Sequence, residues 1–174
     1  MAVSDEHKRL TAMGAGWFRK NGFGVVATEL TCFGSREQPD VIGFRSSCSA
    51  IIEVKVSRSD FFADRKKPER TVGGLGLYRF YLCPEGLISP EELPPKWGLL
   101  YAKGRSVIAV VKGEGNLWPA LRVSLASEAF MGNWRDFQHE PNEEAERRAL
   151  YSIARRLSTN PLPLGNGNGN VRVV

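Results

Sequence analysis

Two short β-forming runs near the middle of the chain carry charged side chains, and this combination restricts what the chain can fold into. The runs are "DVIGFR", residues 40–45, and "AIIEVKV", residues 50–56, and the loop "SSCS" joins them. Their near-continuous apolar character is typical of strands that are covered on both faces. Within them Asp40, Glu53 and Lys55 are charged, and burying a lone charge is expensive. These three side chains must therefore be paired or belong to a site.

A hairpin with its loop at Ser46–Ser49 brings the three charges together. In that register Asp40 lies opposite Lys55, and Ile42 lies opposite Glu53. Side chains alternate along a strand and opposed residues share a face, so the charges meet on one face near the open end of the hairpin. The opposite face is apolar and predicts a core surface: Val41, Gly43, Ile52, Val54 and Val56.

Helices and further strands are predicted on both sides of this hairpin. A helix is expected over residues 4–21, with Ser4 as its N-cap, and a second over 57–69, where Ser57 and Asp60 match the Ser-x-x-Asp start signal. The other predicted elements are strands over 23–33 and 78–84, a hairpin over 97–113 turning at 103–104, and helices over 127–137 and 142–157. This order of elements indicates an α/β or α+β domain.

Length and composition indicate one globular domain. The chain has 174 residues, of which 42% are hydrophobic and 25% charged, which is ordinary for a soluble domain with a full core. We predict a single domain over residues 1–160, with its core over 5–112 and C-terminal helices within 124–158. The glycine–asparagine-rich end, residues 161–174, is predicted to be a flexible tail.

Charge and cysteine content point to the cellular setting. The net charge of +5 mildly favours a polyanionic partner. The three cysteines form no CxxC pair, so we expect reduced thiols in a cytoplasmic protein rather than a zinc site or disulfides. Neither a signal core nor an apolar run of about 18 residues is present, so neither secretion nor a membrane span is expected.

Two carboxylates and a lysine on one face suit the binding of a hard metal ion. Mg²⁺ prefers oxygen ligands, keeps several waters and completes its shell with substrate phosphate. Such an ion polarises a phosphoryl group and lowers the pKa of a bound water. The alternative is a structural salt-bridge cluster at the end of the sheet.

The pattern of the two runs resembles the motif of the PD-(D/E)XK nuclease superfamily. "PD" stands at Pro39–Asp40, and "EVK" follows at Glu53–Lys55 after a short strand and turn. The continuation "KVSRSDFFADRKKPER", with "YRFYLCP" and "LPPKWGLLYA", is similar to the MmcB-like DNA-repair branch, and the resemblance covers roughly residues 5–112. That branch often has an arginine just before the motif aspartate, where this chain has Gln38–Pro39.

The resemblance implies a fold, an activity and roles for individual residues. The fold is a restriction-endonuclease-like mixed β-sheet flanked by helices on both sides. Asp40, Glu53 and the carbonyl of Val54 would bind Mg²⁺ or Mn²⁺, Lys55 would be the catalytic lysine, and Glu29 would be a further catalytic acid. The implied activity is metal-dependent hydrolysis of DNA phosphodiester bonds. The alternative is a non-catalytic DNA-binding or scaffold protein that retains the nuclease fold.

The residues after the motif carry a surplus of positive charge. The segment 57–70 contains five basic and three acidic residues, a net charge of +2. A contact surface for DNA phosphates is one interpretation, and a solvated helix face is the other. The candidate nucleic-acid contacts are Arg58, Arg65, Lys66 and Lys67. The same alternatives hold for Asp60 and Asp64, which either face solvent or support the metal or the substrate.

Other aromatic and histidine residues carry weaker signals. Tyr78, Phe80 and Tyr81 are expected in the strand core rather than stacked on bases, and Trp134 and Tyr151 are expected to pack the C-terminal helices. The two histidines, His7 and His139, are isolated in the sequence, which argues against a histidine-based nuclease and against zinc hydrolysis.

Overall fold

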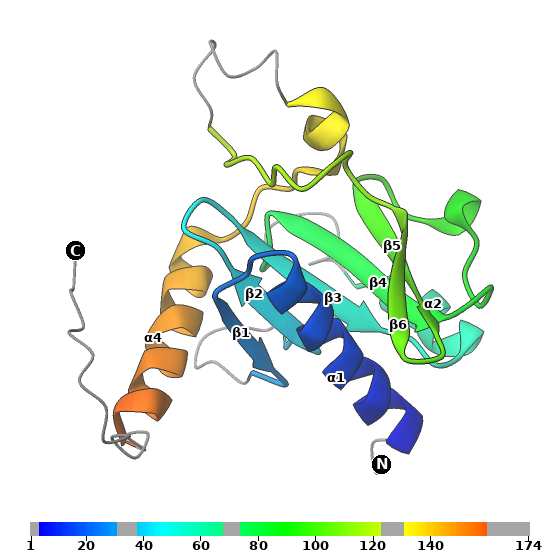
Figure 1. The fold of residues 1–174 in the computed structure, drawn as a ribbon, viewed down its shortest axis with the longest axis horizontal. Coiled ribbons are helices and arrows are strands. Elements are labelled where there is room, and N and C mark those ends of the chain that lie inside the picture. The colour runs from blue at the N-terminus through cyan, green and yellow to red at the C-terminus, as the bar shows by residue number, and fades with distance from the viewer. Residues whose placement is uncertain (1–3, 31–37, 68–73, 123–130, 160–174) are drawn as a thin grey trace.

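The computed structural model describes residues 4–30, 38–67, 74–122 and 131–159, and a six-stranded mixed sheet forms its centre (Figure 1). The strands are β1 (Val25–Thr28), β2 (Val41–Phe44), β3 (Ser49–Val54), β4 (Tyr78–Pro84), β5 (Trp97–Lys103) and β6 (Ser106–Val111). Their spatial order is their chain order. The pairs β3–β4 and β4–β5 are parallel and the others antiparallel. Helix α2 (Arg58–Asp64) lies in the connection between β3 and β4, as a parallel pair requires a crossover.

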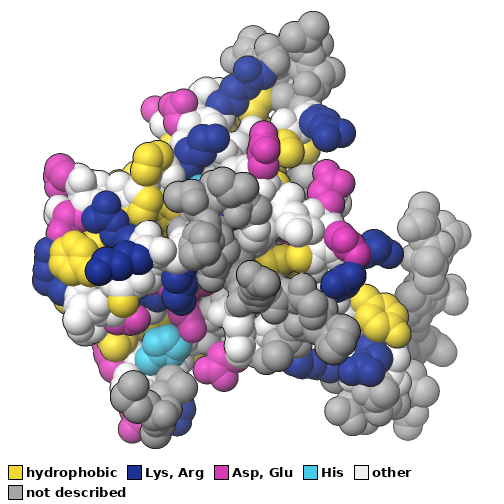
Figure 2. All heavy atoms as spheres, turned by 180° about the vertical axis from the view of Figure 1, so that it is seen from behind, with side chains coloured by type: hydrophobic (Ala, Val, Ile, Leu, Met, Phe, Trp, Pro, Cys, Tyr) yellow, Lys and Arg dark blue, Asp and Glu magenta, His cyan; other side chains and the backbone are white. Residues whose placement is uncertain are grey.

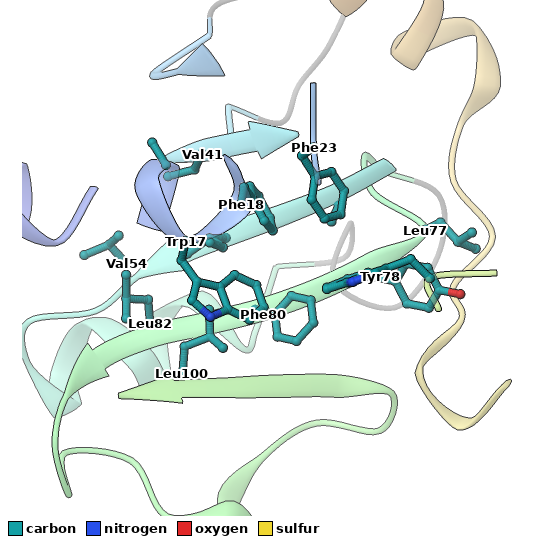
Figure 3. Packing of buried hydrophobic residues seen from close by; sticks show 14 of the residues in the cluster. Trp17, Phe18, Phe23, Val41, Val54, Leu77, Tyr78, Phe80, Leu82 and Leu100 are labelled. Atoms are coloured by element: carbon teal, nitrogen blue, oxygen red, sulfur yellow. The ribbon is translucent and has the colours of Figure 1, made fainter. Parts of the chain in front are cut away.

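Helix α1 (Asp5–Lys20) covers one face of the sheet. It begins where the sequence predicts, because the Ser4 side chain accepts a hydrogen bond from the His7 backbone N–H at 3.2 Å. Trp17 and Phe18 of this helix pack against strand residues that include Val41 and Phe80 (Figure 3). The close approach depends on a glycine, since a Cβ at position 43 would lie 2.9 Å from the Phe18 ring.

A second apolar core occupies the opposite face of the sheet. Strand residues Ile42 and Tyr81 are buried there together with Phe61 of α2 and Ala149 of α4 (Glu143–Thr159). The chain is therefore an α/β protein, and helical residues contribute to the core on each face. The prediction that Val41, Ile52 and Val54 form a core surface is confirmed, and the structure places them in the core under α1. The predicted burial of three aromatics of β4 is confirmed as well: Tyr78, Phe80 and Tyr81.

The register of the β2–β3 hairpin differs from the predicted one. Val41 lies opposite Ile52 and Phe44 opposite Ser49, so the prediction that Asp40 faces Lys55 is wrong by two residues. The cause is the loop, which closes at Arg45, whose backbone N–H donates to the Cys48 carbonyl at 2.8 Å. A shift of two residues leaves each side chain on its own face, because side chains alternate with period two.

The C-terminal part agrees with the sequence only in places. Helix α4 forms as predicted, whereas Gly132–Phe137 forms a 3-10 helix instead of an α-helix. Its i→i+3 bonds begin at Met131, whose carbonyl accepts from Trp134 N at 3.2 Å. Trp134 is buried as expected, but Tyr151 is 68% exposed, so its predicted packing role is wrong. Residues 127–130 and the predicted tail, 161–174, lie outside the described residues.

Within the described ranges, no helix combines the length and the apolar character needed to cross a bilayer.

Candidate functional site

The predicted site residues gather at one edge of the sheet. Glu29 follows β1, Asp40 precedes β2, and Glu53 and Val54 end β3. Because these strands are antiparallel neighbours, the end of β1, the start of β2 and the end of β3 lie at the same edge. A cleft of about 830 Å³ opens there. Its lining residues are Ser4, His7, Glu29, Gln38, Pro39, Asp40, Val56, Ser57, Ser59 and Asp60.

Both carboxylate oxygens of Asp40 have contacts in this cleft. Oδ2 accepts a hydrogen bond from the Val54 backbone N–H at 2.7 Å, and Oδ1 lies 3.2 Å from His7 Nε2. The Asp40 side chain is 19% exposed, so it is held in place yet remains open to the cleft. Sequence reasoning missed His7, because only the packing of α1 on the sheet brings it to Asp40.

Lys55 lies among carboxylates, one of which, Asp60, lines the cleft. Its Nζ is 3.6 Å from Glu53 Oε2, 3.5 Å from Asp64 Oδ1 and 3.9 Å from Asp60 Oδ2. The side chains of Lys55 and Glu53 are each only 5% exposed, whereas that of Asp60 is 49% exposed. Glu53 and Lys55 are thus brought together as the sequence predicts, but neither is among the residues that line the cleft.

The sequence did not decide whether Asp64 faces solvent or supports the site. Asp64 is 1% exposed, its Oδ1 lies 3.0 Å from Lys67 Nζ, and its Oδ2 accepts a hydrogen bond from the Tyr81 hydroxyl at 3.0 Å. The solvated alternative is therefore wrong for Asp64 and fits Asp60, which is half exposed. One buried carboxylate thus links α2, β4 and Lys55, the residue that follows β3.

The predicted nucleic-acid contacts are divided between ion pairs and open surface. Arg58 pairs with Glu92, and this hydrogen bond lowers the pKa of Glu92 to about 2. Lys67 is half exposed while it contacts Asp64, and Arg65 and Lys66 follow α2 as exposed residues. On the face in Figure 2, Lys and Arg side chains form several separate groups with Asp and Glu among them. The described part of this face therefore shows no continuous basic stripe.

The donor set fits a hydrated hard cation. Asp40 and Glu53 would lie opposite one another if the register continued, and Val54 adds a backbone carbonyl beside them. Across the residues that can be described, no three or more His, Cys, Asp and Glu side chains are grouped to hold a metal. Mg²⁺ needs only one or two carboxylates because it keeps its waters, so oxygen donors of this kind suit Mg²⁺ or Mn²⁺.

Comparison with known proteins bears on the fold alone. No family model matches the chain, and no curated protein matches it. Among solved structures, the chain is similar to SPO1766, a protein of unknown function from Silicibacter pomeroyi, with a TM-score of 0.56. The two chains are 24% identical, and the similarity covers 96% of this chain and 98% of the other. At this level of identity, the likeness shows that the two proteins share a fold.

Proposed function

We propose that this protein is a Mg²⁺- or Mn²⁺-dependent nuclease that hydrolyses phosphodiester bonds in DNA, with a restriction-endonuclease-like fold and a site of the PD-(D/E)XK type. The observation that carries the proposal is the buried Lys55 ammonium, 3.6 Å from Glu53 Oε2, at the sheet edge where Asp40 faces the cleft. Burying carboxylates is costly without nearby cations. A metal ion bound beside Lys55 would offset the charge of these carboxylates, and metal binding would be the reason why they are buried.

Each residue would have a distinct task. The carboxylates of Asp40 and Glu53 and the carbonyl of Val54 would hold the ion. When bound, the ion would polarise the phosphate and lower the pKa of a water. The Val54 N–H and His7 orient Asp40, Lys55 would offset phosphate charge and orient the attacking water, and Glu29 would contact water at the cleft wall.

A second hypothesis is a DNA-binding or scaffold protein that keeps this fold without turnover. One observation favours it: the Lys55 ammonium lies among three carboxylates, and Lys55 is not one of the residues that line the cleft. A lysine held in this way can also be a structural ion pair.

A cleavage assay with matched variants tests the proposal. Single-stranded, duplex, nicked and branched DNA would be incubated with the protein in Mg²⁺, in Mn²⁺ and in chelator. We expect metal-dependent cleavage that Glu53→Gln abolishes and Glu85→Gln preserves, since Glu85 pairs with Lys103 at an exposed site. Mn²⁺ should also raise the melting temperature of the wild type but not of Glu53→Gln, because a ligand that binds only the folded state stabilises it.

Two outcomes would contradict the nuclease hypothesis. A wild type that cleaves none of these DNAs, but is stabilised by Mn²⁺ and binds DNA, supports the non-catalytic alternative. A wild type without any metal response supports the structural salt-bridge cluster.

A further inference from the structure

The Tyr81 hydroxyl connects the sheet core to the candidate site. The Tyr81 ring stacks on Trp97 with 4.3 Å between centroids and meets Phe61 edge-on at 5.1 Å. Tyr81 lies directly across the β3–β4 ladder from Glu53, and its hydroxyl donates to Asp64 Oδ2 at 3.0 Å. Aromatic packing on both sides fixes the ring, so the hydroxyl restrains Asp64 at Oδ2, while Lys67 Nζ lies 3.0 Å from Oδ1.

Asp64 extends this constraint to Lys55. The Lys55 Nζ lies 3.5 Å from Asp64 Oδ1 and 3.6 Å from Glu53 Oε2, so the ammonium is shared between a helix acid and a strand acid. Its third acidic neighbour, Asp60, is 49% exposed and lies farther away, at 3.9 Å. If the ion pair between the Lys55 ammonium and Asp64 were weakened, the ammonium would therefore move toward Glu53, the other buried carboxylate.

We propose that Asp64 and Tyr81 are positioning residues that keep the Lys55 ammonium from closing onto Glu53. This inference rests on the nuclease function proposed above. When the ammonium is held back, Glu53 is available to a divalent cation and Lys55 is available to the phosphate. Neither Asp64 nor Tyr81 contacts the metal or the substrate in this arrangement, and both act through Lys55.

The sharpest variant is Tyr81→Phe, which removes one hydroxyl and keeps the ring packing. Its matched control is Tyr78→Phe on the same strand, because the buried Tyr78 hydroxyl donates to the Pro119 carbonyl at 2.6 Å, and Tyr78 belongs to the core under α1. The Tyr78 hydroxyl also accepts a hydrogen bond from Gln138 Nε2 at 3.0 Å, so a purely structural effect should be at least as large in Tyr78→Phe as in Tyr81→Phe. Partners that orient metal ligands affect metal affinity or activity by about 10–100-fold.

Mn²⁺ affinity and DNA cleavage would be measured for the wild type, Tyr81→Phe and Tyr78→Phe. Tyr81→Phe is expected to weaken Mn²⁺ binding and lower kcat, each by about tenfold or more, with little change in the KM for DNA. Tyr78→Phe should behave as the wild type. Equal behaviour of the two tyrosine variants would overturn the positioning role.

Lys55→Met provides a test that does not depend on activity. If Tyr81 acts through Lys55, Tyr81→Phe should no longer weaken Mn²⁺ binding once Lys55 is replaced, because no ammonium remains to close onto Glu53. If Tyr81→Phe weakens Mn²⁺ binding just as much in the Lys55→Met background, the proposal is overturned. If Lys55→Met fails to fold, the comparison of Tyr81→Phe with Tyr78→Phe still tests the positioning role. A wild type that binds no Mn²⁺ would instead overturn the nuclease function itself.

Discussion

Replacing Lys55 by methionine should destabilise the protein far more than replacing Glu53 by glutamine. Methionine keeps most of the apolar length of the lysine side chain but removes the ammonium. That ammonium lies within 3.5–3.9 Å of carboxylate oxygens on Glu53, Asp60 and Asp64. Glutamine at position 53 removes one negative charge and leaves Lys55 with two carboxylates.

The contacts of Lys55 determine how much the free energies of unfolding of Lys55→Met and Glu53→Gln should differ. Two unit charges 4 Å apart interact by about 4 kcal/mol at an effective dielectric constant of about 20, and removing one partner of a buried ion pair costs about 3–5 kcal/mol. Lys55→Met should cost this much, because Glu53 and Asp64 stay buried without that cation. In a domain of this size the loss corresponds to a fall in melting temperature of about 10 °C. Glu53→Gln should change stability by only about 1 kcal/mol, because repulsion among the acids falls as well.

Thermal and urea unfolding in chelator would measure both variants. The matched controls are Lys103→Met and Glu85→Gln, whose ion pair spans 3.0 Å with side chains 60% and 51% exposed. An exposed pair contributes about 1 kcal/mol or less, so both controls should stay close to the wild type. Equal losses for Lys55→Met and Glu53→Gln would refute the reasoning, because they would mean that these two residues form an isolated pair.

Two further predictions concern packing and pH. Gly98→Ala should lower the free energy of unfolding by about 1–3 kcal/mol, because a Cβ would lie 2.3 Å from the Phe80 ring. Gly16→Ala in α1 should raise it by about 1 kcal/mol, because a Cβ there meets nothing within 4 Å. Similar effects of the two variants in urea unfolding would contradict this prediction. Burial raises the pKa of Glu146, so the folded protein binds more protons than the unfolded one between the ordinary pKa and the raised pKa. Stability should therefore fall as pH rises through that interval and stay lower above it. Between pH 4 and 8 this contribution should appear as a difference: the melting temperatures of the wild type and of Glu143→Gln should fall relative to that of Glu146→Gln as pH rises, and a difference that does not change with pH would contradict the assignment.

The sequence predicted the faces of the β2–β3 hairpin better than its register. The core face under α1 follows from the alternation of apolar residues, which any even shift preserves. The loop gave no comparable signal, because Ser46, Ser47 and Cys48 contain none of the Asn-Gly or Asp-Gly pairs that fix a two-residue turn. Hence the convergence of Asp40 and Glu53 at one edge was predictable, and the residue opposite each of them was not.

Contacts between elements explain what the sequence could not show about Asp40. Its contact with the Val54 N–H follows from the hairpin, within which both residues lie close to the open end. Its contact with His7 depends on where α1 crosses the sheet, and no spacing along the chain specifies that crossing. An isolated histidine in a helix therefore became part of the cleft only through tertiary packing.

The phase of helix α2 decides which charged side chain reaches Lys55. Phe61 and Phe62 are adjacent, so either one could form the apolar stripe of the helix. In the structure Phe61 is fully buried and Phe62 is 41% exposed. Residues three apart share a helix face, so the burial of Phe61 turns Asp64 inward, toward Lys55 and Tyr81. With Phe62 inward, Arg65 would take that place and would repel the Lys55 ammonium, so the packing of one phenylalanine selects a carboxylate as the partner of the lysine.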